Sequence, residues 1–188
     1  MGGSIDHHLW WYVARSSGIV AWAILSGSMA FGLTLSTRLF GRGIAPAWLL
    51  DLHRHLGALA VGFTALHMVA LVADSYIEFG LTELLVPMAS PWKTGAVAYG
   101  IVAMWLMLLV EGSSLMMRRL GRRAWRTIHM TSFFAFAMAA AHGVMAGTDA
   151  RRGIVQVALL STVMVVMFLT IVRILAERGA RRRTVVAS

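Results

Sequence analysis

The chain of 188 residues contains no cysteine. This absence excludes disulfide bonds, cysteine-ligated iron–sulfur clusters, zinc–thiolate sites and haem attached through a Cys-x-x-Cys-His motif. A metal in this protein must therefore be held by histidine, methionine or carboxylate side chains. Seven histidines are present, and they are the obvious pool of metal ligands.

Charged side chains are also scarce. They make up 13% of the residues, whereas 59% of the residues are hydrophobic and the mean hydropathy is +0.73. A soluble domain carries about 25% charged residues, so this composition indicates an integral membrane protein. The net charge of +9 would suit a nucleic-acid partner. However, the basic residues cluster between apolar runs, as in cytoplasmic loops, and we expect no nucleic acid.

Five apolar runs are each long enough to cross a bilayer as a helix, because about 20 residues rising 1.5 Å each span a core of about 30 Å. We therefore expect an all-α membrane helix bundle, forming a single domain over residues 1–188. No basic region precedes the first run, which predicts a retained span and not a cleaved signal peptide. The expected spans are 17–36, 53–73, 94–115, 128–147 and 154–175.

Lysine and arginine are divided unevenly between the two ends of these spans. Thirteen of the 17 fall beside the connections after the first and third spans and after the fifth span, and four fall on the other side. The positive-inside rule then places the N-terminus outside and the C-terminus in the cytoplasm. We expect a multi-pass protein of the cell (plasma or inner) membrane, surrounded by membrane lipid.

Four histidines form two pairs on the second and fourth spans. His53 and His67 are fourteen positions apart, and His129 and His142 are thirteen apart. Both spans enter the membrane from the same side, so His53 and His129 should lie at one depth. His67 and His142 should then lie at another depth, about 20 Å away along the helices. An imidazole without a partner is costly in a bilayer, and two depth-matched pairs indicate a ligand set.

Such pairs suit two b-type haems, each iron taking one histidine from each span, and bis-imidazole ligation favours one-electron transfer. Zinc or copper would need ligands that converge, which two layers about 20 Å apart cannot provide. Three alternatives remain. His55 could replace His53 as the inner ligand, or one haem could be bound instead of two. The third alternative is a non-redox membrane scaffold or small transporter with packing or proton-relay histidines.

The helical phase of the two pairs differs. Fourteen positions place His53 and His67 on one side of a helix, whereas thirteen positions leave His129 and His142 about 140° apart. The fourth span is therefore expected to be kinked or irregular, or to approach the haems at different angles.

Other residues have a structural and a functional interpretation. Arg54 and Arg126 flank the inner histidines and could bind haem propionates, or they could be ordinary positive-inside anchors. We expect Glu111 to form an interfacial ion pair with Arg118 or Arg119. The small residues of the first span predict close helix packing, and we expect no chemistry there. Trp125 is expected to anchor the membrane interface.

The motif Leu52-His53-Arg54-x-x-Gly57 with Leu66-His67, followed by Trp125-Arg126-x-x-His129 and His142, resembles the ferric reductase-like transmembrane domain family. That family includes NADPH oxidases, ferric-chelate reductases and the haem subunit of the periplasmic methionine sulfoxide reductase system. The resemblance covers residues 50–147. It implies two haem b groups, the inner on His53 and His129 and the outer on His67 and His142.

The resemblance also implies an electron-transfer haem subunit of an oxidoreductase, with an outer acceptor such as ferric iron or a partner reductase. Two departures affect this expectation. Family members often have six spans, whereas five are counted here. No Gly-x-Gly-x-x-Gly follows a strand, and the flavin–nicotinamide module of the oxidases is absent. We therefore expect a redox partner protein or a quinol as the electron donor.

Overall fold

The computed structural model describes residues 3–37, 47–74, 79–147 and 153–186, without the side chains of residues 3–8 and 180–186. These residues are almost entirely helical and contain no strand, which confirms the all-α prediction. The helices are α1 (Gly3–Thr37), α2 (Ala47–Ala73), α3 (Leu81–Leu85), α4 (Thr94–Leu115), α5 (Met117–Leu120), α6 (Arg122–His129), α7 (Ser132–Ala146) and α8 (Gly153–Val186).

Among the described residues, five segments are long and apolar enough to cross a membrane, as predicted. They are Leu9–Thr37, Ala47–Ala73, Thr94–Leu115, Arg122–Ala146 and Gly153–Gly179. Several of these begin well before the predicted spans. The second begins at Ala47, six residues earlier than expected, so His53 lies inside a helix and not at its start. The polar residues that ended the predicted runs are thus accommodated within longer helices.

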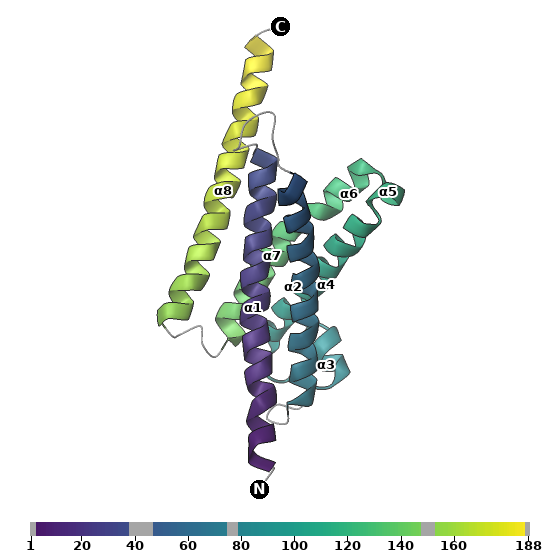
Figure 1. The fold of residues 1–188 in the computed structure, drawn as a ribbon, viewed down its shortest axis with the longest axis vertical. Helices are drawn as coiled ribbons and strands as arrows, with labels where there is room; N and C mark the ends of the chain where they lie inside the picture. Colours follow the sequence, from purple (N-terminus) through teal and green to yellow (C-terminus); the bar gives the residue numbers. More distant parts are fainter. Residues whose placement is uncertain (1–2, 38–46, 75–78, 148–152, 187–188) are drawn as a thin grey trace.

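The long helices pack in pairs. Helix α1 lies antiparallel along α2, α4 packs against α7, and α8 leans along α1 (Figure 1). The two ends of the described chain lie at opposite ends of the bundle. Helices α2 and α7 run in the same direction, which is the condition for matching the depths of their histidines.

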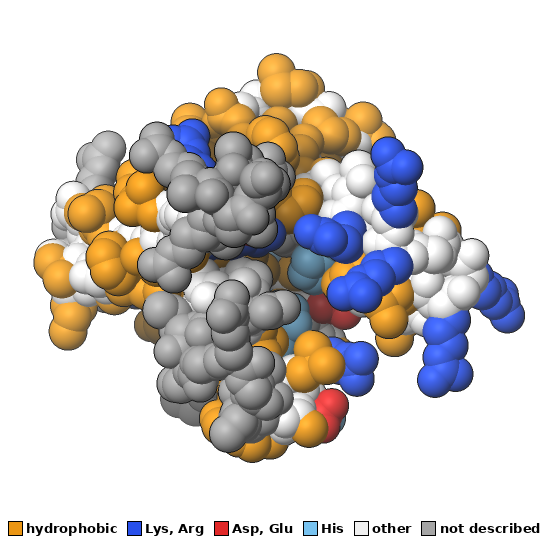
Figure 2. Space-filling model, turned by 90° about the horizontal axis from the view of Figure 1, so that it is seen from above, with side chains coloured by type: hydrophobic (Ala, Val, Ile, Leu, Met, Phe, Trp, Pro, Cys, Tyr) orange, Lys and Arg blue, Asp and Glu red, His pale blue; other side chains and the backbone are white. Residues whose placement is uncertain are grey.

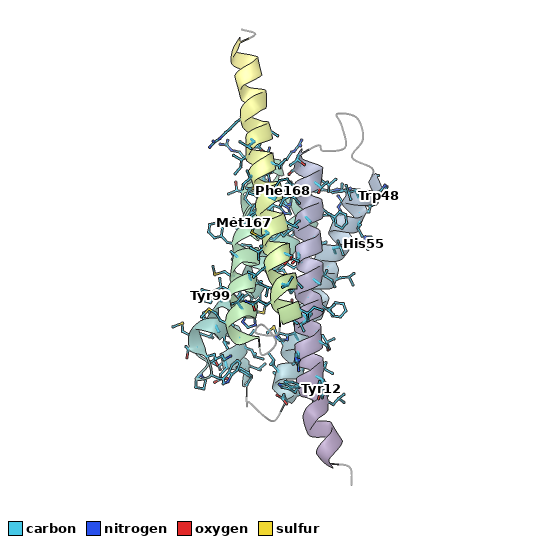
Figure 3. All side chains as sticks on the ribbon, turned by 90° about the vertical axis from the view of Figure 1, so that its left-hand side faces the viewer. Tyr12, Trp48, His55, Tyr99, Met167 and Phe168 are labelled. Carbon is cyan, nitrogen blue, oxygen red and sulfur yellow. The ribbon has the colours of Figure 1, made fainter. Side chains whose placement is uncertain are left out.

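Small side chains fill the interior and large apolar ones cover the outside. Ala14, Ala60 and Ala70 are at most 5% exposed, whereas Phe168 is 64% exposed. Figure 3 shows Tyr99, Met167 and Phe168 pointing away from the bundle. A soluble bundle would bury such residues, but in a bilayer they contact lipid while small residues allow the helices to approach closely.

The fourth predicted span is divided into two helices. Helix α6 ends at its histidine, and two residues of turn separate it from α7. In this turn the N–H of Thr131 donates to the carbonyl of Ile128 at 2.9 Å, a bond between residues three apart. Such a turn rotates the chain by about 120° per residue instead of 100°. This turn is the irregularity expected in the fourth span. It brings His142 closer to the side of the segment on which His129 lies.

The short helix α3 covers one end of α4. Phe79 and Leu84 are buried in a cluster that also contains Val97 of α4, and the indole Nε1 of Trp105 donates to the carbonyl of Leu85 at 2.9 Å. This packing holds the connection between the second and third spans against the bundle.

Candidate functional site

The two predicted histidine pairs come together in the structure. The ring centres of His53 (α2) and His129 (α6) lie 6.0 Å apart, and those of His67 (α2) and His142 (α7) lie 6.4 Å apart. The ring planes are 77° apart in both pairs. The pairing follows the predicted depths, with one layer toward the α6 end of the bundle and the other toward the α3 end.

These separations match two imidazoles on one metal ion. Two metal–nitrogen bonds of about 2.0 Å and two ring radii of about 1.1 Å place the ring centres about 6.2 Å apart. An edge-to-face contact between two rings spans a similar distance. The hydrogen bonds of the ring nitrogens therefore distinguish a metal-binding pair from a simple ring contact. No cluster of three or more His, Asp or Glu occurs among the residues that the structure describes. Each layer therefore offers two imidazoles.

Three of the four imidazoles are held at Nδ1 by a backbone carbonyl. A carbonyl can only accept a hydrogen bond, so Nδ1 carries the proton and, in the neutral ring, Nε2 keeps a free lone pair. Metal-binding histidines commonly use this arrangement, in which one nitrogen binds the metal and the other donates to a carbonyl. The three bonds run from His67 to Ala14 at 2.6 Å, from His142 to Ala96 at 2.8 Å and from His53 to Ser28 at 3.0 Å.

His129 is held differently. Its Nδ1 is buried and has no hydrogen-bond partner among the described residues. Its ring instead stacks on Trp125, with centres 5.0 Å apart and planes 28° apart. The indole Nε1 of Trp125 donates to the Ser114 hydroxyl at 3.2 Å, which fixes the stacking partner. The sequence predicted only an interface anchor at Trp125, but the structure places it against a candidate ligand.

Three glycines face the same histidines from neighbouring helices. Gly18 and Gly32 of α1 lie against the rings of His67 and His53, and Gly100 of α4 lies against the ring of His142. The sequence predicted helix packing and no chemistry for the first span. The small residues do permit close packing, but two of them contact candidate ligands. The sequence did contain a signal for these contacts, because Gly18 and Gly32 are fourteen residues apart, as are the two α2 histidines.

The alternative inner ligand is placed elsewhere. His55 is exposed, and its Nδ1 lies 2.7 Å from the carbonyl of Asp51 in its own helix. Figure 3 shows it on the outer side of α2. The structure therefore brings His53, and not His55, opposite His129.

Basic side chains lie near the inner pair. Figure 2, seen from the end of the bundle where α8 finishes, shows histidine and a carboxylate in a recess bordered by lysine and arginine side chains. Arg54 is 62% exposed and lies 3.6 Å from Asp51, and Arg126 is exposed without a side-chain partner among the described residues. Arg173 of α8, whose Nε donates to Glu177 at 3.2 Å, also lies near His129, which the sequence did not suggest.

Glu111 does not form the predicted ion pair with Arg118 or Arg119. Helix α4 ends at Leu115, so these residues no longer share one helical face. The carboxylate instead lies against Gly57 of α2, which is one turn beyond His53. Among the described residues it has no ion-pair partner, and the expectation of an interfacial salt bridge was wrong.

A comparison with known families agrees with this site. Residues 17–140 match the family described as ferric reductase like transmembrane component. The matched segment is about two thirds of the chain, contains three of the four paired histidines and ends two residues before His142. No curated protein and no solved structure matches the chain.

Proposed function

The chain belongs to the ferric reductase-like transmembrane family, and we propose that it is a dihaem b-type cytochrome subunit carrying electrons across the membrane. Membership of the family supports a membrane electron-transfer component. The observation that carries the dihaem proposal is the meeting of two histidine pairs at iron-compatible separations of 6.0 and 6.4 Å. We assign His53 and His129 to an inner haem, and His67 and His142 to an outer haem.

In this proposal the chain binds and orients a haem at each layer. A haem held there supplies one-electron Fe(III)/Fe(II) chemistry. Two imidazoles on one iron leave no position for a further ligand, so the acceptor is reduced without binding to that iron. We propose ferric iron or a partner reductase as the acceptor on the outer side.

The recess at the inner pair supports the proposed donor side. Guanidinium groups bind carboxylates with two parallel hydrogen bonds, so Arg54, Arg126 and Arg173 are candidates for the propionates of the inner haem. Cations around a recess also attract an anionic donor surface. We propose that a quinol or a redox partner protein delivers electrons at this end. The arginine distribution supports a cytoplasmic position for it, in a protein of the plasma or inner membrane.

Haem content tests the proposal directly. We expect protein purified from cells supplied with ample haem to carry about two haem b per chain in a pyridine haemochrome assay. Protein that purifies colourless under these conditions would overturn the assignment. A content of one haem per chain would support the single-haem alternative and contradict electron transfer through two haems in turn.

The ring geometry adds a spectroscopic prediction. Imidazole planes 77° apart at both pairs should give low-spin ferric haems of the highly anisotropic type, whose electron paramagnetic resonance spectra are typical of near-perpendicular ligand planes. Ordinary rhombic signals from both haems, which are typical of near-parallel planes, would contradict the ring geometry. High-spin ferric signals from both haems would contradict bis-histidine ligation.

The proposed orientation can be tested because the chain contains no cysteine, so that single cysteines can be introduced without background. Lys93 precedes α4 at the α3 end of the bundle, and Arg119 lies in α5 at the other end; both are exposed. We expect a membrane-impermeant maleimide to label Lys93→Cys in intact cells and Arg119→Cys only after lysis. The reverse pattern would place the His53 layer on the outside.

A further inference from the structure

We propose that α1 and α4, which carry none of the assigned ligands, position three of the four histidines through one repeated contact. This carbonyl–glycine clamp consists of a backbone carbonyl that accepts from Nδ1 and a glycine four residues later that faces the ring. The inference rests on the proposed haem ligation. The three clamps are Ala14 and Gly18 on His67, Ser28 and Gly32 on His53, and Ala96 and Gly100 on His142.

The two clamps on α1 are in register with α2. Fourteen residues separate Gly18 from Gly32, and fourteen separate His53 from His67. The helices are antiparallel, so equal steps along both return the same contact about 21 Å further along (Figure 1). Residues four apart share one helical face, which lets a carbonyl and a glycine act on the same ring. Helix α1 therefore presents one contact twice, once at each depth.

The space left by each glycine is small. A Cβ at Gly18 would lie 3.1 Å from Nδ1 of His67, and a Cβ at Gly32 would lie 3.0 Å from Cε1 of His53. At Gly100 it would lie 2.7 Å from Nδ1 of His142. All three are shorter than the 3.4–4 Å of an ordinary van der Waals contact to a Cβ. Any other residue would push the ring away from the helix that holds its Nδ1.

Displacing the ring would have a chemical consequence. The carbonyl fixes the proton on Nδ1 and therefore leaves the free lone pair on Nε2, where it can bind a metal. A ring that is pushed out must lengthen its Nδ1 hydrogen bond or turn its Nε2. Either change alters the ligand field that the histidine provides, and the bond to a carbonyl also makes the ring a stronger donor to a metal. Gly18, Gly32 and Gly100 are thus positioning residues.

The fourth histidine shows that the clamp is not a general result of helix packing. His129 has no carbonyl at Nδ1 among the described residues, and none of the described glycines faces its ring. It ends α6 at the turn before α7, where the helical register changes, and it is held by stacking on Trp125 instead. The inner layer therefore has one clamped ligand, whereas the outer layer has two.

The test compares three glycine-to-alanine variants of the full-length haem-loaded protein. Gly18→Ala should shift the electron paramagnetic resonance signal and the midpoint potential of the outer haem only, and Gly32→Ala those of the inner haem only. Gly100→Ala, with the shortest contact, should shift the outer haem further than Gly18→Ala and release part of it during purification. Alanine is the better helix former, so these effects do not come from weakened helices.

Control glycines are available on α1 and α2. At Gly27 of α1 a Cβ would meet only Cδ1 of Leu56, at 3.9 Å, and at Gly62 of α2 it would meet nothing within 4 Å. Gly27→Ala and Gly62→Ala should therefore leave both haem signals unchanged. Unchanged spectra and potentials in all three clamp variants would overturn the inference. So would equal shifts of both haems in each variant, since these would indicate loosened packing and not local positioning.

The failure of the clamp can be distinguished from failure of the proposed function. If the wild-type protein binds two haems and the three glycine variants show unchanged haem spectra and potentials, only the clamp is contradicted. A colourless wild-type protein contradicts the haem assignment on which the clamp depends.

Discussion

The His67→Ala variant is expected to bind about one haem per chain, against the two that we propose for the wild-type protein. His67 belongs only to the outer pair, and its ring centre lies 6.4 Å from that of His142. The other pair lies fourteen residues away along α2, or about 21 Å, so its geometry does not depend on this side chain. The remaining haem should keep the inner signal, and electron transfer across proteoliposomes should fall to background because one layer is missing.

Haem per chain and the reduced-minus-oxidised spectrum provide the measurement. His142→Ala should give the same result, because it removes the facing ligand of the same layer. The matched control is His55→Ala, which removes an exposed histidine of α2 that does not face a second span. It should retain both haems. Two haems in His67→Ala, or the loss of one in His55→Ala, would contradict the ligand assignment.

The Phe136→Ala variant is expected to destabilise the bundle by about 2–4 kcal/mol. Phe136 of α7 is 6% exposed and stacks on Trp22 of α1, with ring centres 4.8 Å apart and planes 25° apart. In a bilayer the removed ring gains little from apolar transfer, since lipid tails are as apolar as the protein interior. The cost is therefore the cavity between α1 and α7 and the lost aromatic contact.

Phe134 is the matched control, because it lies two residues earlier in the same helix and is 66% exposed. Phe134→Ala should change the free energy of unfolding by less than about 0.5 kcal/mol. Reversible unfolding in mixed micelles, followed by helical circular dichroism, measures both variants. Equal effects at the two positions would contradict the packing of α1 on α7.

Much of the fold follows from the sequence because span length and hydropathy are local properties. The five apolar runs predicted five membrane-spanning segments, and the shared direction of the second and fourth predicted the pairing of His53 with His129. The ends of the helices were harder to predict from the sequence. Helix α2 continues through Asp51 and Arg54, because a helix need not end where its apolar run ends.

The parts that the sequence did not predict depend on which helices are neighbours. The turn after His129 has neither proline nor glycine, so no local signal marked its place, and only the 140° phase offset required an irregularity. The roles of Gly18 and Gly100 arise because α1 lies along α2, and α4 along α7. The predicted ion pair of Glu111 was wrong for a similar reason. The end of α4 separates residues that one continuous helix would have brought together.

The division of the histidines between hairpins has a consequence for biogenesis. The first two spans to be synthesised already contain the contacts of α1 on both α2 histidines, yet these two residues lie at different depths and cannot share one iron. Their facing partners, His129 of α6 and His142 of α7, leave the ribosome more than fifty residues after α2 ends. On the proposed ligation, we therefore expect haem to bind late in assembly, after α6 and α7 have joined the α1–α2 hairpin.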